Sequence, residues 1–119
     1  MNVELQPAVK LTVFIGGDER FEHHPLFDAV MAVLQSGGIA GATVTKGMMS
    51  YGRGGRLHTD LNEIMMENLP LIIEAVDESE KIESVAAPLA AMLGERGLIE
   101  IHRTAIIKHA LPSKEGSAN

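Results

Sequence analysis

The sequence predicts an α+β domain in which a four-stranded antiparallel sheet carries two helices on one face. Three observations predict this class. The 119 residues have the length of one ordinary domain, glycine and proline divide the chain into short periodic segments, and strand and helix periods follow in the order β-α-β-β-α-β. We expect the domain to span residues 8–110, between a flexible N-terminus of residues 1–7 and a flexible tail of residues 111–119.

The first strand and the first helix are predicted between Lys10 and Gly38. Residues 10–15 alternate between two faces, and the turn Gly16-Gly17-Asp18 ends the strand. Pro25 suits the first turn of a helix, and Gly37-Gly38 suits its end. Four apolar residues between them recur at helical spacing: Leu26, Val30, Val33 and Leu34.

The second and third strands flank a glycine-rich segment. Residues 42–51 are predicted as the second strand because β-branched residues dominate its first half. The glycines of residues 52–56 follow, and then a short segment with apolar residues at helical spacing: Leu61, Ile64 and Met65. Pro70 opens the third strand, which covers residues 71–76.

The second long helix is predicted after Asp77 and the last strand after Gly94. Asp77 and Glu80 resemble a capping box at the start of this helix. Pro88 lies inside the helical pattern, so we expect a kink or a break there. The last strand covers residues 98–109. The apolar face of the helix is formed by Ile82, Val85, Ala86, Leu89 and Leu93.

The order β-α-β-β-α-β is that of the ferredoxin-like arrangement. Apolar residues occupy both faces of its third strand, where Leu71, Ile73 and Ala75 alternate with Ile72 and Val76. Two helices cover only one face of such a sheet. We therefore expect self-assembly to bury the other face.

Composition excludes several classes of function. The net charge of −6 argues against nucleic acid as the main partner, because phosphate binding needs clustered Lys and Arg. The absence of cysteine excludes disulfides, thiolate metal sites and a cysteine nucleophile. No basic leader and no apolar stretch of about 18 residues is present, so we expect a cytoplasmic protein without direct membrane insertion.

The five histidines and the serines do not predict a catalytic or metal site. His23 and His24 are adjacent, and His102 and His109 are seven residues apart, so no pair has the spacing of a zinc motif. Ser50 lacks the setting of a nucleophile elbow. We therefore predict no catalytic residue and no metal ligand, and a protein that is not an enzyme.

Two glycine-rich turns are better candidates for a binding site. Gly52, Gly54 and Gly55 interleave with Arg53 and Arg56, and the turn Gly94-Glu95-Arg96-Gly97 joins a helix to a strand. Glycine lets backbone N–H groups approach an anion, and arginine donates two hydrogen bonds to phosphate. Neither turn matches the P-loop or the dinucleotide fingerprint, so a plain turn remains the alternative for each.

Several short blocks follow one another in a fixed order along residues 8–110. They include Phe14-Ile15-Gly16-Gly17-Asp18, His24-Pro25-Leu26, Gly41 to Val44, Tyr51-Gly52-Arg53, Leu57-His58-Thr59, Asn68-Leu69-Pro70, Ile73 to Asp77 and Glu80-Lys81-Ile82-Glu83. These ordered blocks resemble the PII signal-transduction proteins, and more closely a PII-like family catalogued as a domain of unknown function, family one-ninety.

This resemblance implies a homotrimer that binds an adenine nucleotide in clefts between subunits, with or without Mg²⁺. By position, Gly41 and Thr43 would lie near the base, Gly52 and Arg53 near the phosphates, and Gly94, Arg96 and Gly97 in place of the phosphate-binding loop. The loop of residues 53–68 would report the ligand state to a transporter, a channel or an enzyme.

The chain also departs from the PII pattern. The arginines that close the last PII strand are absent, and Lys108 is the nearby candidate for a cation. Fewer cations mean a weaker hold on a triphosphate, so AMP, ADP and cyclic nucleotides are as plausible as ATP. Two alternatives stay open: a metal-binding trimer like CutA that uses His23, His24, His58 or His102, and an enzyme with His58 as its general base.

Overall fold

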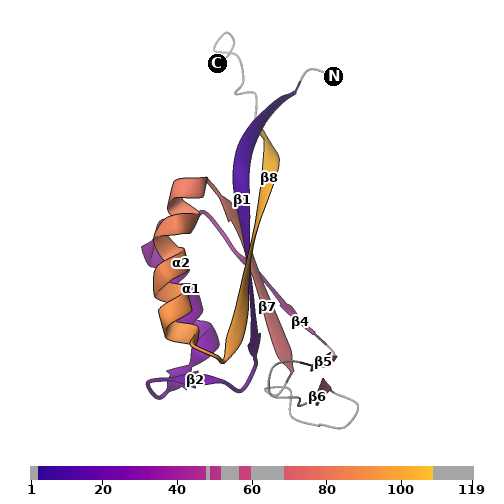
Figure 1. Ribbon diagram of the computed structural model, residues 1–119, viewed down its shortest axis with the longest axis vertical. Helices are drawn as coiled ribbons and strands as arrows, with labels where there is room; N and C mark the ends of the chain where they lie inside the picture. Colours follow the sequence, from indigo (N-terminus) through magenta and orange to yellow (C-terminus); the bar gives the residue numbers. More distant parts are fainter. Residues whose placement is uncertain (1–2, 48, 52–56, 60–68, 109–119) are drawn as a thin grey trace.

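Two helices pack on one face of a four-stranded antiparallel sheet (Figure 1). The computed structural model describes residues 3–47, 49–51, 57–59 and 69–108. The strand order β4-β7-β1-β8 confirms the predicted ferredoxin-like arrangement. Its elements are β1 (Glu4–Gly16), α1 (Leu26–Ser36), β4 (Thr43–Lys46), β7 (Pro70–Asp77), α2 (Ser79–Leu93) and β8 (Gly97–Lys108).

The core lies between the sheet and the helices. On β1 the residues of the predicted apolar face are at most 4% exposed, and they face the helices because alternate strand residues share a face. Each helix buries most of the stripe that its periodicity predicted, except that Val33 is only partly buried and Ala86 is not among the buried residues of α2. The members of this core include Leu11, Val13, Ile15, Leu26, Val30, Leu34, Ile73, Ala75, Ile82, Val85, Leu89 and Leu93.

β1 begins at Glu4, six residues before the predicted start of the first strand. Residues 4–7, which we expected in a flexible segment, are the first four residues of this strand. They are ordered by β8, which pairs with β1 without interruption from Glu4↔Lys108 to Ile15↔Gly97. β7 pairs with β1 only from Val9 onward. The two strands therefore continue past the helices as a two-stranded arm (Figure 1).

The single strand predicted over residues 42–51 is wrong, because the structure divides it at Gly47. β4 ends at Lys46, opposite Leu71, and the Gly47 N–H donates to the Pro70 carbonyl at 2.8 Å. Since β7 begins at Pro70, residues beyond Gly47 have no further partner among the described residues of the main sheet. β5 (Met49–Tyr51) instead pairs with β6 (Leu57–Thr59) in a separate two-stranded sheet. The short helical segment predicted near Ile64 lies outside the described residues.

A small hairpin between β1 and α1 was not predicted. It pairs β2 (Arg20–Phe21) with β3 (His24–Pro25). Its two-residue turn consists of Glu22 and His23, whose φ angles are +51° and +74°. Two positive φ angles are characteristic of the type I′ turn, which matches the twist of a hairpin. Non-glycine residues rarely adopt this conformation, so the sequence pattern did not reveal it.

α2 continues through Pro88, so the predicted break is wrong. Pro88 is exposed, and its side of the helix faces water. The carbonyl of Ser84, which proline deprives of its usual partner, is therefore solvated at little cost.

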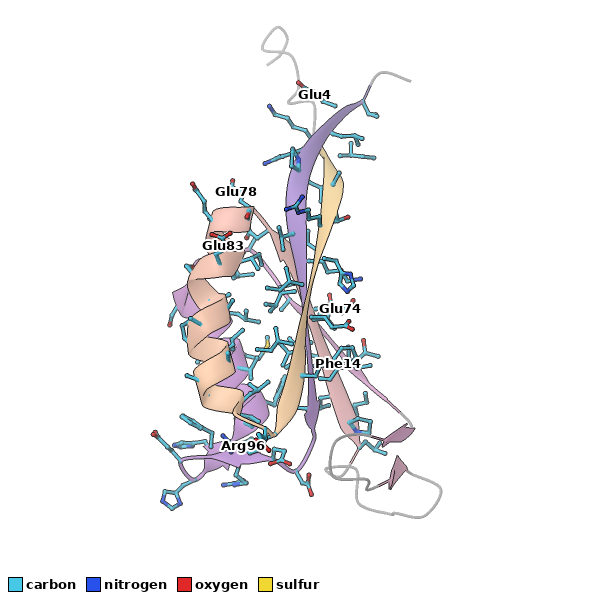
Figure 2. All side chains as sticks on the ribbon, viewed as in Figure 1. Glu4, Phe14, Glu74, Glu78, Glu83 and Arg96 are labelled. Carbon is cyan, nitrogen blue, oxygen red and sulfur yellow. The ribbon has the colours of Figure 1, made fainter. Side chains whose placement is uncertain are left out.

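The face of the sheet opposite the helices retains exposed apolar side chains. Val76 is 38% exposed, Leu98 55% and Ile106 40% in the single chain. The register places all three on the same face as Phe14, which points away from the helices (Figure 2). The prediction that the two helices cover only one face is confirmed.

Candidate functional site

An open cleft of about 720 Å³ lies on the uncovered face of the sheet. All four strands or their flanking loops contribute to it, because alternate residues of neighbouring strands project to the same side. Two residues that we predicted for nucleotide binding, Gly41 and Thr43, are among those that line it. Its remaining lining residues are Lys10, Ala40, Glu74, Ala75, Val76, Thr104, Ala105 and Ile106.

An ion pair occupies the cleft. Lys10 Nζ lies 3.4 Å from Glu74 Oε2, and the two side chains are 40% and 43% exposed. Glu74 points away from the helices (Figure 2). A pair this exposed contributes little to stability, because water screens it and both side chains lose freedom. Its hydrogen-bonding groups are therefore available to a ligand that offers both donors and acceptors.

The loop before β4 shapes one wall of the cleft. Gly38 has φ +77°, the Gly38 N–H donates to Gln35 O, and the Ile39 N–H donates to Leu34 O. These bonds form a Schellman motif at the end of α1, with Ile39 packed into the core. The next amide, that of Ala40, donates to Asp77 Oδ2 at 2.9 Å. The loop is thus fixed up to the residue before Gly41.

Asp77 does not form the predicted capping box. No side-chain bond caps α2, whose N-cap residue is Glu78. The Asp77 carboxylate instead accepts the Ala40 N–H on one oxygen and the Glu78 N–H on the other, at 2.7 Å. Burial opposes ionisation of this carboxyl, but those two amides and the charge of Lys81, 4.0 Å away, outweigh it and hold the pKa of Asp77 below its usual value.

The turn between α2 and β8 holds three predicted phosphate-binding residues, but Arg96 is engaged within the fold. Its guanidinium donates to the carbonyls of Met92 at 2.6 Å and of Arg20, and its carbon lies 5.8 Å from the ring centroid of Phe21. Arg96 lies at the lower end of the molecule in Figure 2. The arrangement ties the β2–β3 hairpin to the end of α2, which is a structural role.

The structure explains why both Gly94 and Gly97 of this turn are glycine. Gly94 ends α2 with φ +58°, a conformation that other residues rarely adopt. A Cβ on Gly97 would lie 2.6 Å from the Phe14 carbonyl oxygen, so only glycine lets β8 start this close to β1. At Gly41, in contrast, a Cβ would meet nothing within 4 Å.

The remaining predicted residues lie elsewhere. Lys108 ends β8 opposite Glu4, whereas Gly97 lies opposite Ile15. Glu4 and Ile15 are eleven positions apart along β1, which is about 36 Å at the rise of a strand. Gly52 and Arg53 lie outside the described residues. One protomer therefore brings Gly41 and Thr43 together but keeps Gly94, Arg96 and Gly97 apart from Lys108.

Among the cleft residues that were not predicted, the charged ones are Lys10 and Glu74, and Asp77 lies directly behind the cleft wall. Glu74 was detectable as a charge that interrupts an apolar strand, which requires a partner or access to water. Lys10 was indistinguishable from any lysine at a strand start. Asp77 matched a capping pattern, and only the tertiary structure reveals that its partner is the amide of Ala40, 37 residues away.

In the part of the chain that the structure describes, no three His, Asp or Glu side chains gather as a metal site would require. His102 approaches a single carboxylate, with Nε2 3.4 Å from Glu100 Oε1. His58 has no described side chain. None of the described helices has the length and apolarity needed to cross a membrane.

Family comparison matches most of the chain. Residues 8–106 match the sequence profile of DUF190, described as "Uncharacterized ACR". A UPF0166 protein of Methanocaldococcus jannaschii is 36% identical over 91 residues, which are 76% of this chain and 83% of that protein. A UPF0166 protein of Aquifex aeolicus is 30% identical over 73 residues, 61% of this chain and 70% of its own.

Solved structures share the fold. The CPII protein of Thiomonas intermedia K12, a nitrogen regulatory PII-like protein solved with ADP, AMP and bicarbonate, superposes with a TM-score of 0.67 and 16% identity, over 88% of this chain and 92% of that one. Its apo form gives a TM-score of 0.64 and 16% identity, over 90% and 99%. These likenesses confirm a PII-like fold.

Proposed function

Because this chain belongs to the DUF190 (UPF0166) family and has a PII-like fold, we propose that it is a non-enzymatic regulator that binds an adenine nucleotide. In this proposal three copies assemble through the uncovered sheet face, and the nucleotide binds in clefts between them. Residues 53–68 pass the ligand state to a protein partner in the cytoplasm, such as a transporter, a channel or an enzyme.

The observation that carries the proposal is the cleft itself. Gly41 and Thr43, chosen from the sequence as residues near the base, both line it, and apolar side chains such as Val76 and Ile106 are next to them. A cleft that is open on one side and bordered by exposed apolar residues is suited to completion by a second copy. PII-like CPII, whose fold this chain shares, was solved with ADP and AMP bound.

The charges of the cleft give a triphosphate no clear advantage over nucleotides with fewer phosphates. Lys10 is already balanced by Glu74, and no other Lys or Arg among the described residues lines the cleft. A phosphate group needs further cations, and in our proposal these are Arg53 and the Lys108 of a neighbouring copy. Because each charge-assisted hydrogen bond contributes about 1.5–3 kcal/mol, a site with few cations holds AMP, ADP or a cyclic nucleotide about as well as ATP.

Calorimetric titration tests the proposal. The purified protein is titrated with AMP, ADP, ATP, cyclic AMP and cyclic di-AMP, with and without Mg²⁺, while light scattering gives its molar mass. We expect a trimer that binds about one nucleotide per subunit. Failure of all five nucleotides to bind would refute the proposal, whatever the mass.

A pair of threonine variants locates the site. Thr43→Val removes the hydroxyl that lines the cleft, and Thr45→Val makes the same change two residues further along β4, outside the cleft lining. We expect Thr43→Val to weaken binding about fivefold or more and Thr45→Val to leave it unchanged. Equal affinities in the two variants would place the nucleotide elsewhere. Arg96→Ala is unsuitable for this purpose, because it also removes contacts within the fold.

A further inference from the structure

We propose that Asp77 is the positioning residue of the nucleotide cleft: its carboxylate joins the wall at Ala40 and Gly41 to the start of α2. The inference rests on the proposed function, since it assigns a role within that same site. Asp77 lines no part of the cleft and would not touch the ligand. It acts through the backbone that it holds.

The contacts of Asp77 link segments that are far apart in the sequence. Oδ2 accepts the amide of Ala40 from the loop after α1, and Oδ1 accepts the amide of Glu78 at the start of α2. Both carboxylate oxygens are thus used, and the side chain is only 10% exposed. Hydrogen bonds to a carboxylate are about twice as strong as those between neutral groups, so this connection is well suited to fixing a loop.

The position of Asp77 relates this connection to the cleft. Ala75 and Val76, the two residues before Asp77, line the cleft from β7, while Ala40 and Gly41 line it from the loop. Asp77 therefore sets the separation of two walls of the same cleft. Gly41 has no side chain to pack, and a Cβ there would meet nothing within 4 Å, so the loop depends on its backbone bonds for its place.

The same geometry predicts a link between the cleft and α2. A ligand that contacts Ala40 or Gly41 touches a backbone segment whose Ala40 amide donates to the Asp77 carboxylate. That carboxylate also accepts the amide of Glu78 at the start of α2. Occupation of the cleft should therefore protect the Ala40 amide further, and loss of the carboxylate should be felt in the cleft. A merely structural carboxylate would affect stability but not nucleotide affinity in the folded protein.

The test compares Asp77→Asn and Asp77→Ala with the wild type, using ADP and AMP as ligands. Asparagine keeps the size of the side chain but lacks a second acceptor oxygen, and alanine removes both acceptors. We expect nucleotide affinity to fall at least fivefold in Asp77→Asn and further in Asp77→Ala. Hydrogen exchange of the Ala40 amide should accelerate at least tenfold in both.

Two controls separate positioning from other effects. Glu78→Gln removes the same charge one residue away, from a side chain that makes no capping bond. Leu89→Ala destabilises the fully buried part of α2 without touching the cleft lining. We expect both controls to keep wild-type affinity under conditions where they are folded.

The outcomes are distinct. If the wild type binds ADP or AMP and Asp77→Asn binds equally well, the inference is refuted while the proposed function stands. Loss of affinity in Leu89→Ala as large as that in Asp77→Asn would refute it too, because general loosening would then explain both. If the wild type binds neither nucleotide, the proposed function itself fails, and the role of Asp77 fails with it.

Discussion

Replacing Gly97 with alanine should destabilise the protein through packing, whatever the turn binds. The added Cβ would lie 2.6 Å from the carbonyl oxygen of Phe14 and 2.9 Å from both Ile15 Cγ2 and Leu93 Cδ2. Ile15 and Leu93 are buried, and the Phe14 oxygen belongs to the backbone of β1. None of the three neighbours can move without disturbing the core or the β1–β8 ladder.

The magnitude follows from how far the strands must separate. Carbon and oxygen normally stay more than 3 Å apart, so β8 must shift away from β1 by several tenths of an ångström where the ladder begins. Overpacking of this kind costs about 1–3 kcal/mol, and the involvement of backbone places Gly97→Ala in the upper part of that range, at about 2–3 kcal/mol. For a chain of this size the melting temperature should fall by about 8–12 °C.

Gly41→Ala is the matched control for this prediction. The same methyl group at Gly41 meets nothing within 4 Å, so its unfolding free energy should stay within about 0.5 kcal/mol of the wild type. Denaturant unfolding followed by circular dichroism measures both variants. A loss below about 0.5 kcal/mol in Gly97→Ala, or equal losses in the two variants, would contradict the packing explanation.

Four other outcomes are expected. Arg96→Ala should lower the unfolding free energy by about 2 kcal/mol. Arg96→Lys should recover little of this loss, because an ammonium cannot reach three separate carbonyls and stack on Phe21. Full recovery of stability by lysine in a thermal melt would contradict this reasoning. Because the pKa of Asp77 is lowered in the folded state, its carboxylate should stabilise the protein at neutral pH. The difference in unfolding free energy between the wild type and Asp77→Asn should shrink as the pH falls below about 4. A constant difference across a pH series would contradict this. Leu89→Ala should cost about 2–5 kcal/mol at a fully buried site, measured by denaturant unfolding. Lys10→Met should change the unfolding free energy by less than about 1 kcal/mol, because the side chains of Lys10 and Glu74 are both about 40% exposed. The same variant should bind nucleotide more weakly in calorimetry, and unchanged affinity would exclude Lys10 from the site.

Local patterns were enough to predict the helices and the order of the strands. The alternation in β1 and the stripes of α1 and α2 report directly which side chains are buried, because burial follows the period of each element. Where the chain departs from these patterns, the cause lies in a distant partner. β4 ends because β7 begins at Pro70, and β1 starts early because β8 is long enough to pair with Glu4.

Some residues of the candidate site could likewise be identified from the sequence, whereas the roles of others depend on the tertiary structure. Gly41 and Thr43 were identifiable from a sequence block that resembles a known family, and the structure places both in one cleft. Arg96 had the residue type and the glycine neighbours of a phosphate-binding turn, but its donors are used by Met92, Leu93 and Arg20. A sequence records which donors exist, and it does not record which acceptors the fold brings to them.

The sequence by itself determined the α+β class, the burial pattern of the core and the family, since each depends on spacing along the chain or on ordered residue blocks. Only the tertiary structure decided that Lys10 pairs with Glu74, that Asp77 holds Ala40, and that Gly97 is required for the approach of β8 to β1. The physical reason is that hydrogen bonds, ion pairs and close contacts depend on distances of a few ångströms between atoms. Those distances are set by how the strands and helices pack, and residues tens of positions apart in the sequence become neighbours only then.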